Sequence, residues 1–434
     1  MRDRGVLFRK SAYFCFNLDS FPVMLRLTIC LGLICLLQPS LYATNGLHCA
    51  APGNKSRGMV GAGVAFPQEA LSAAINPAGM TAVPNELDVG VRVFVPIRSY
   101  TATTGTGPMP IAPGKVKSGS EVFVIPEIGY RYGFAEGRGA AGFTFCANGG
   151  LNTNYKTSVF GAGDAGGNLL QGFFSPSISW KVTPKFSIGG SIVGAFQRVD
   201  IRGVQSFAPL SSDPSNLSNR GKDYSYGVGV KLGFLYQVVP QLTIGASVQP
   251  PIPMTKFNRY KGLFEGGGRF DVPATSTVGF AWRVTDPFTL VFDVQHIAYS
   301  TNKALHNGSS CRLGGGPCLG NKGGTGFGWK NLLVYKIGAN WGVDNDWALR
   351  CGYSHSNQTV PSAQVLFNSI APAVIQDHVS AGVSKKVNES NELNFSFLYA
   401  FKNSVSGQNS FSPDQTIKLT MEQFTVGLNW VWMF

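Results

Sequence analysis

The sequence predicts an all-β protein, a 14-stranded antiparallel transmembrane β-barrel with its N-terminal segment folded inside the lumen. Three observations predict it. Apolar side chains recur at every second position over segments of about ten residues. Short turns alternate with long loops, and no apolar run after the N-terminal region approaches the roughly 20 residues that a spanning helix needs. A soluble sandwich, the competing fold, buries its apolar face, whereas a barrel turns it to lipid.

The first part of the chain has the pattern of a secretory signal. A basic region ending at Arg26 precedes an apolar run, and Leu41-Tyr42-Ala43 offers a cleavage site. We expect residues 1–43 to be an upstream extension plus a signal peptide that is removed, residues 44–85 to be a plug, or hatch, and residues 86–434 to be the barrel. Export implies an oxidising compartment.

Cysteine spacing predicts one local disulfide. The mature chain keeps Cys49, Cys146, Cys311, Cys318 and Cys351. Cys311 and Cys318 share one Gly-rich loop, which favours a disulfide over metal binding. The odd number leaves at least one free thiol.

The composition argues against nucleic-acid, nucleotide and metal partners. The formal charge is +13, but the basic residues are scattered and do not cluster with aromatic residues. The stretch Gly61–Phe66 has a GxGxxF pattern, yet no hydrophobic strand precedes it, as a dinucleotide loop requires. We therefore expect no nucleic acid, no cofactor and no metal.

Strand-like segments with one apolar face begin at Glu86 and continue to the end of the chain. Leu393, Phe395 and Phe397 share one face, with Asn394 and Ser396 opposite. Six short turns and seven long loops alternate, and these 13 connections join 14 strands. The short turns lie near 134–140, 182–186, 238–242, 284–288, 343–347 and 387–392, and the long loops lie near 101–119, 150–171, 201–221, 252–269, 299–329, 357–373 and 403–414. This alternation is typical of outer-membrane barrels.

The last predicted strand alternates aromatic and small residues and finishes on Phe434. Such a strand closes a barrel and supplies aromatic residues at the membrane boundary. It also resembles the signal that the outer-membrane assembly machinery recognises.

Four motifs resemble the FadL family of outer-membrane long-chain fatty-acid transporters, which includes toluene- and xylene-type hydrocarbon transporters. They are Thr44-Asn45-Gly46, the glycine-rich stretch 56–65, Asn76-Pro77-Ala78-Gly79-Met80, and the stretch 148–155. The resemblance covers the mature chain in architecture and about 45 residues in motifs. It implies a 14-stranded barrel occluded by an N-terminal hatch, in the outer membrane of a Gram-negative bacterium.

The resemblance also implies a route for the ligand. An apolar molecule adsorbs to an external groove, passes to a pocket in the lumen, and leaves sideways into the membrane after the hatch rearranges. The hatch motif is Asn76, Pro77 and Ala78, and the kinked third strand with its lateral opening maps to Gly149 and Gly150. The groove maps to two long loops with the side chains Phe207, Leu210, Phe257, Tyr260, Leu263 and Phe264.

The chemistry of these residues supports parts of this route. Exposed Phe and Leu on long loops mark an apolar binding surface, although such residues also order loops by packing on one another. A fatty-acid carboxylate needs a cationic or hydrogen-bonding partner. Strand parity places Arg92, Arg98 and Lys231 inward as candidates.

The sequence therefore predicts passive uptake of hydrophobic molecules, with long-chain fatty acids as the first hypothesis and aromatic hydrocarbons as the alternative. The expected partners are the ligand, outer-membrane lipid and the barrel assembly machinery, and we expect a monomer. A barrel enzyme is a third hypothesis, but the sequence has no GxSxG elbow and none of its five histidines stands in a nucleophile context. A hydrophilic pore is a fourth.

Overall fold

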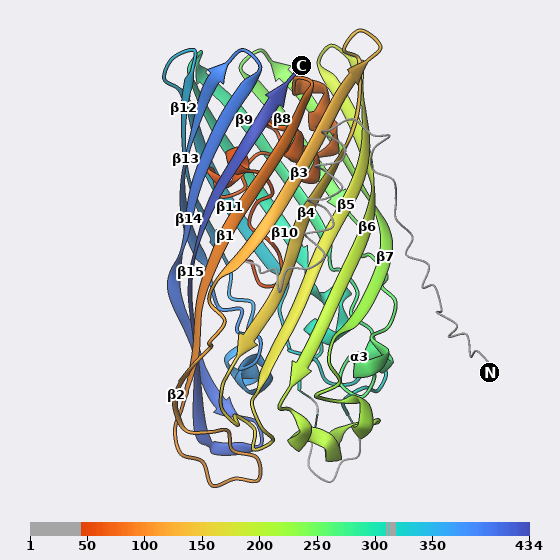
Figure 1. Ribbon diagram of the computed structural model, residues 1–434, viewed down its shortest axis with the longest axis vertical. Helices are drawn as coiled ribbons and strands as arrows, with labels where there is room; N and C mark the ends of the chain where they lie inside the picture. The colour runs from red at the N-terminus through yellow and green to blue at the C-terminus, as the bar shows by residue number, and fades with distance from the viewer. Residues whose placement is uncertain (1–44, 310, 312–317) are drawn as a thin grey trace, which may run out of the picture. The chain divides into compact units, whose positions relative to one another are not determined.

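The protein forms a closed antiparallel β-barrel (Figure 1). Its structure, a computed structural model, describes residues 45–309, 311 and 318–434. The predicted extension and signal peptide, and Thr44, lie outside the described residues. All strands belong to one sheet, and pairing of β15 with β1 closes it. Because the short β2 pairs only with the outer end of β1, 14 of the 15 strands make the wall, and the predicted fold class is confirmed.

The strands follow one another around the barrel in sequence order. They are β1 (Glu86–Ala102), β2 (Gly114–Lys117), β3 (Phe123–Phe134), β4 (Gly139–Asn154), β5 (Gly166–Thr183), β6 (Phe186–Arg202), β7 (Asp223–Val239), β8 (Leu242–Gln249), β9 (Ala274–Thr285), β10 (Phe288–Ala298), β11 (Leu332–Gly342), β12 (Trp347–Ser356), β13 (Asp377–Asn388), β14 (Asn391–Asn409) and β15 (Ser412–Met433).

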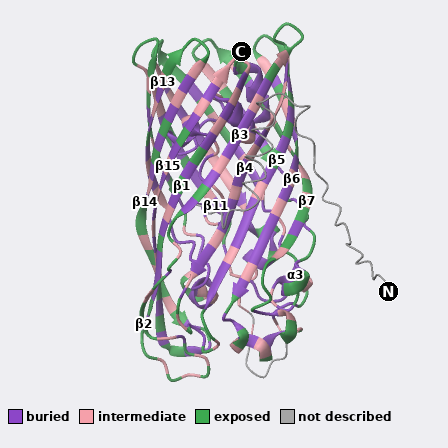
Figure 2. Cartoon of the chain, in the orientation of Figure 1, coloured by how far each residue is buried: buried purple, intermediate pink, exposed green. Residues whose placement is uncertain are grey.

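The apolar faces of the strands point outward, as the alternation predicts. Figure 2 shows exposed and buried residues alternating along the strands. On β7, Val228 is 69% exposed, whereas the neighbouring lumen-facing Ser225 is fully buried. The same holds on β14, where Phe395 and Phe397 are exposed and Ser396 is buried. A polar interior beneath an apolar exterior is the arrangement of a membrane barrel rather than of a sandwich.

Short turns gather at one end of the barrel and long loops at the other (Figure 1). The predicted loop at 403–414 is wrong, because β14 and β15 continue through it to a tight turn at Ser410-Phe411. The residues there are mostly polar on both faces, so their sequence lacks the one-sided apolar pattern by which the other strands were recognised. Backbone pairing such as Gly407 with Ile417 extends the hairpin nevertheless.

The described part of the predicted hatch, residues 45–85, lies inside the barrel and is called the hatch below (Figure 1). It contains one short α-helix and two short 3-10 helices: α2 (Asn54–Arg57), η2 (Ala70–Ala74) and η3 (Pro77–Ala82). Most of its residues are buried. None of the helices in the described part of the chain is long and apolar enough to cross a membrane.

The long loops fold over the outer end of the barrel around a large apolar cluster that contains Phe207, Tyr260, Trp329 and Leu366. Cys311 and Cys318 form a disulfide in one of these loops, and Cys49, Cys146 and Cys351 are free. The loop helices are η4 (Gln205–Leu210), η5 (Pro214–Asn216), η6 (Asn258–Tyr260), α3 (Glu265–Gly268), η7 (Tyr299–Thr301), α4 (Lys303–His306), η8 (Ser362–Gln364) and α5 (Val365–Asn368).

Candidate functional site: the hatch, the lumen cavity and the outer loops

The Asn76-Pro77-Ala78 motif attaches the hatch to the barrel wall. The Asn76 amide nitrogen donates to the carbonyl oxygens of Val64 (2.7 Å) and Phe234 on β7 (2.9 Å), and its oxygen accepts from the Ala78 amide (3.1 Å). Pro77 fits the first position of η3, where no amide donor is needed. The motif thus caps a helix and fixes the hatch to β7.

Glycines on the inner wall let the motif approach this closely. A Cβ at Gly233 on β7 would lie 2.1 Å from the Asn76 side-chain oxygen. A Cβ at Gly189 on β6 would lie 2.4 Å from the Ala78 nitrogen. Both distances are well inside van der Waals contact, so the two glycines are needed for the hatch to sit where it does.

A buried ion pair holds the other side of the hatch. Arg57 at the end of α2 donates from one guanidinium nitrogen to both carboxylate oxygens of Glu127 on β3, at 2.7 and 2.8 Å. Both side chains are at most 2% exposed. Asp293 on β10 accepts from the backbone amides of Gly63 (2.8 Å) and Val64 (3.0 Å). The hatch is therefore held by polar contacts to several strands as well as by packing.

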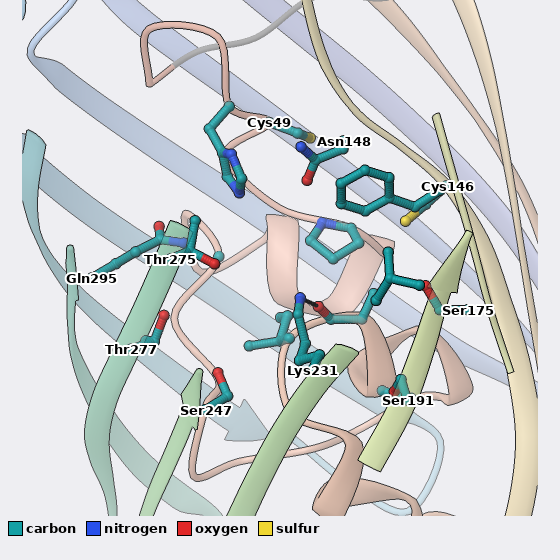
Figure 3. Close-up of a pocket in the computed structure, with 18 of the residues that line it drawn as sticks. Cys49, Cys146, Asn148, Ser175, Ser191, Lys231, Ser247, Thr275, Thr277 and Gln295 are labelled. Carbon is teal, nitrogen blue, oxygen red and sulfur yellow. Dashed lines mark hydrogen bonds between the residues drawn. The ribbon is translucent and has the colours of Figure 1, made fainter. Parts of the chain in front are cut away.

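A cavity lies between the hatch and the wall (Figure 3). Its polar lining includes Lys231, Lys336, Asn148 and Gln295, and its apolar lining includes Phe173. The free space is about 60 Å³, far below the roughly 300 Å³ of the smallest ordinary ligand pockets. A ligand of that size fits only when the hatch moves.

Two lysines bring positive charge to this cavity. Lys231 on β7 donates to the carbonyl oxygen of Ala74 at 2.5 Å, and Lys336 on β11 lies 3.4 Å from those of Ala50 and Gly61. Within the described residues, neither ammonium group forms an ion pair with a carboxylate. Strand parity predicts that Lys231 faces inward, and the structure agrees. Lys336 also faces inward, but parity does not show which strands face the same cavity, so the sequence does not single it out.

His48 in the hatch also lines the cavity. Burial, followed by the positive charges of Lys231 and Lys336, lowers its pKa to about 3. The ring is therefore neutral at ordinary pH. It adds hydrogen-bonding capacity to the cavity without adding charge.

Arg92 and Arg98 on β1 face inward, as predicted, but neither lines this cavity. Arg92 donates to the Cys49 sulfur (2.6 Å) and to the Ala51 carbonyl (3.1 Å) of the hatch. Arg98 donates to the carbonyls of Asn152 and Ser120. Each guanidinium group thus links β1 to backbone segments that lie elsewhere in the sequence.

The β4 strand is irregular at Gly149 and Gly150, the predicted site of the kink. Its pairing with β5 shifts between Ala147 and Gly149, and its pairing with β3 ends at Phe145. The start of the hatch continues along the edge left free: Cys49 donates to the Asn148 carbonyl (2.7 Å), and Gly150 donates to the Leu47 carbonyl (3.1 Å). A Cβ at Gly149 would lie 1.7 Å from the Leu47 oxygen.

The six apolar residues assigned to the external groove do gather in the loops, but the expectation that they are exposed is wrong for five of them. These five are buried, with exposed fractions of 0 to 5%, because the loops pack on one another: Phe207, Leu210, Phe257, Tyr260 and Phe264. Leu263 is half-buried.

Three of the six, Phe207, Leu263 and Phe264, line a narrow apolar pocket together with Phe160 and Phe367. Its free space is about 40 Å³, so binding there also requires the loops to separate.

A family model described as "Outer membrane protein transport protein (OMPP1/FadL/TodX)" matches residues 44–428. The chain belongs to this OMPP1/FadL/TodX family. Its place is therefore the outer membrane of Gram-negative bacteria, and it is a transporter of hydrophobic compounds. No curated protein sequence matches it.

Solved structures of the family share the fold. The P. putida toluene transporter TodX is 16% identical and has a TM-score of 0.65; the match covers 89% of this chain and 99% of that one. A Pseudomonas aeruginosa FadL homologue is 14% identical with a TM-score of 0.66, covering 90% and 100%. The CymD monoaromatic hydrocarbon channel is 18% identical with a TM-score of 0.58, covering 90% and 99%.

The OMPP1/FadL/TodX family consists of transporters and channels. Among the described residues, no group of three or more His, Cys, Asp or Glu side chains is arranged to hold a metal ion. Four of the five histidines have no place in the cavity lining; only His48 is there. The cavity lining offers charged and hydrogen-bonding side chains.

Proposed function

We propose that the protein takes up long-chain fatty acids passively through the outer membrane. The observation that carries this proposal is the pair Lys231 and Lys336, whose ammonium groups face one cavity and, among the described residues, have backbone carbonyl oxygens as their hydrogen-bond partners. Taking a carboxylate out of water costs several kcal/mol unless a cation or hydrogen-bond donor compensates. The two lysines supply both, since each ammonium group is a cation that also donates hydrogen bonds.

The proposed route starts in the outer loops. The apolar pocket around Phe207 and Phe264 captures the hydrocarbon part once the loops part. The molecule then reaches the lumen cavity after the hatch rearranges, since the present free space does not hold it.

We propose that the ligand leaves the cavity at the β3–β4 edge. There β4 has lost its pairing with β3, and the hatch segment Leu47–Cys49 covers the free edge. Movement of that segment uncovers a path to lipid. Leaving sideways keeps the chain out of water, where each exposed CH₂ costs about 0.8 kcal/mol.

Uptake of labelled oleate by cells that lack a transporter of their own tests the proposal. We expect uptake with the wild-type protein, little with an empty vector, and strongly reduced uptake with a Lys231→Ala/Lys336→Ala double variant. Lys185→Ala is the matched control, because Lys185 is exposed in a short turn. Equal uptake with and without the protein would refute the proposal.

Uptake of aromatic hydrocarbons is the second candidate. The outer pocket is rich in aromatic side chains, with Phe160, Phe207, Phe264, Phe327 and Phe367 among its lining, and such side chains pack well on ring-shaped ligands. The lysine double variant separates the two candidates, because toluene has no carboxylate. If toluene enters the cells and oleate does not, the aromatic candidate replaces the first.

A further inference from the structure

The barrel wall contains a second interruption, between β7 and β8. Their pairing ends at Leu232 with Val248, and the next contact is an isolated bridge between Gly227 and Met254. Within the described structure, no backbone pair joins residues 228–231 to residues 249–253. Three of the latter five are prolines, which have no amide hydrogen to donate. We call this interruption the β7–β8 seam.

An apolar groove lies on the lipid-facing surface beside the seam. Its rim is formed by large outward-facing side chains, including Ile188, Leu232 and Val248, and its floor by the small residues Gly190 and Ala246. The free space of this open groove is about 780 Å³, which is large enough for one side of a hydrocarbon chain to lie along it while the other side faces lipid. Its size comes from small residues set among large ones on neighbouring strands.

The groove and the lumen cavity share part of their lining. Ser247 on β8 and Thr277 on β9 belong to both. Lys231, which faces the cavity, is adjacent to Leu232, which faces the groove, and the β7–β8 pairing stops between them. At this level a single strand thickness separates the two spaces.

The inner side of the seam is closed by side-chain packing. Ile252 and Met254, which flank Pro253, lie against the inner face of β7. A Cβ at Gly229 would be 2.5 Å from Ile252, and one at Gly227 would be 2.4 Å from Met254. Both belong to an apolar cluster with Phe173 and Val193, which line the cavity. Backbone hydrogen bonds also hold this segment, from Thr255 to Tyr226 on β7 (2.9 Å) and between Ile252 and Val272. Beside residues 228–231 the described contact is apolar packing, which is non-directional and can open and re-form there without breaking a ladder of hydrogen bonds.

We propose that the β7–β8 seam is a second lateral exit, and that the groove binds the hydrocarbon chain of the molecule leaving the cavity. The proposal rests on the proposed function for the nature of that molecule. The cavity reaches from Cys146 on β4 to Lys336 on β11, so it touches both interruptions of the wall. The polar end of the ligand remains near Lys231 while its chain enters the groove.

Filling the groove from outside tests the proposal without altering the lumen. Ala246→Trp and, independently, Gly190→Leu place a large side chain in the groove, because both positions belong to its lining. A Cβ at Gly190 would lie 3.3 Å from the Leu232 side chain. We expect each to lower the rate of oleate uptake by cells roughly tenfold. The matched control is Ala381→Trp, since Ala381 is an exposed outward-facing residue of β13, and it should leave uptake unchanged. Heat-modifiable electrophoretic mobility confirms that each variant is folded.

The outcomes separate this proposal from the proposed function. Wild-type uptake above the empty-vector level with unchanged uptake in both groove variants would overturn the second exit and leave fatty-acid transport intact. Absence of wild-type uptake would instead overturn the transport proposal itself.

Photolabelling in proteoliposomes gives an independent measure. We expect a diazirine derivative of oleate to label the groove at Leu232 and Val248 in preference to the surface around Ala381. Equal labelling of the two surfaces would mean that the probe only partitions into the bilayer, and it would overturn the assignment of the groove.

Discussion

Arg57 and Glu127 form a buried ion pair between the hatch and β3. Removing one partner of such a pair leaves an uncompensated charge in a place that water does not reach, whereas removing both leaves none. The pair therefore acts less as a source of net stability than as a device that fixes the position of the hatch against this strand.

The first prediction concerns that pair. Arg57→Ala should destabilise the protein by about 3–5 kcal/mol, and the double variant Arg57→Met/Glu127→Met should recover most of the loss. Urea unfolding of the purified protein measures both. The exposed pair Lys385–Asp346 is the control, and Lys385→Ala should cost less than about 1 kcal/mol. Similar losses for Arg57→Ala and Lys385→Ala would contradict the prediction.

The second prediction concerns pH and His48. Since its pKa falls from 6.5 to about 3 on folding, the unfolded chain takes up a proton more readily than the folded one between these values. The stability that the neutral ring contributes is complete above pH 6.5 and is lost as pH falls toward 3, by on the order of 1 kcal/mol per pH unit. His48→Gln should abolish this part of the pH dependence.

Thermal unfolding at about pH 7.5 and about pH 4.5 checks this second prediction. Between the two pH values, the Tm of the wild-type protein should fall further than the Tm of His48→Gln. All other groups titrate in both proteins, so subtracting one decrease from the other leaves the contribution of His48. Parallel declines would show that His48 does not govern the loss.

At the scale of elements, β4 and the start of the hatch depend on each other. The edge of β4 beyond Phe145 has no partner in β3, and the hatch segment Leu47–Cys49 supplies one. Only glycine at position 149 permits this, because any Cβ there would meet the Leu47 oxygen.

The third prediction follows from this contact. Gly149→Ala should detach the hatch segment Leu47–Cys49 from β4, because the two backbone hydrogen bonds between them would be lost at about 1 kcal/mol each. The rate at which a maleimide labels Cys49 should then rise at least roughly tenfold. A Cys351→Ser background removes the exposed thiol. Gly172→Ala is the control, since a Cβ there meets nothing within 4 Å. Unchanged labelling in Gly149→Ala would show that the segment does not rely on this approach.

For the molecule as a whole, the hatch determines whether the lumen of the barrel is blocked or is open to water and ions. The lumen wall is polar, with serine, threonine, asparagine and glutamine side chains facing the hatch. Water and ions therefore have a compatible path as soon as the hatch is absent.

The fourth prediction is that deletion of residues 45–80 converts the protein into an open pore. In planar bilayers the wild-type protein should show little conductance, and the deletion variant should show large, stable steps. The N-terminal residues up to 44 are kept in both proteins so that export is the same. Equally large conductance in the wild-type protein would favour the hydrophilic-pore hypothesis.

The sequence by itself determined the barrel, because the period-two pattern has to place one face of every strand in lipid and the alternation of turns and loops sets the number of strands. Its resemblance to the OMPP1/FadL/TodX family also pointed to Asn76 and Gly149, and the local backbone effects of proline and of paired glycines support both positions. Only the tertiary structure decided which charges share a cavity, that Lys336 joins Lys231 while Arg92 and Arg98 do not, and that most of the loop phenylalanines are buried. Those outcomes depend on contacts between segments far apart in the chain, and strand parity gives the side of the wall on which a residue lies but not the neighbour that it meets there.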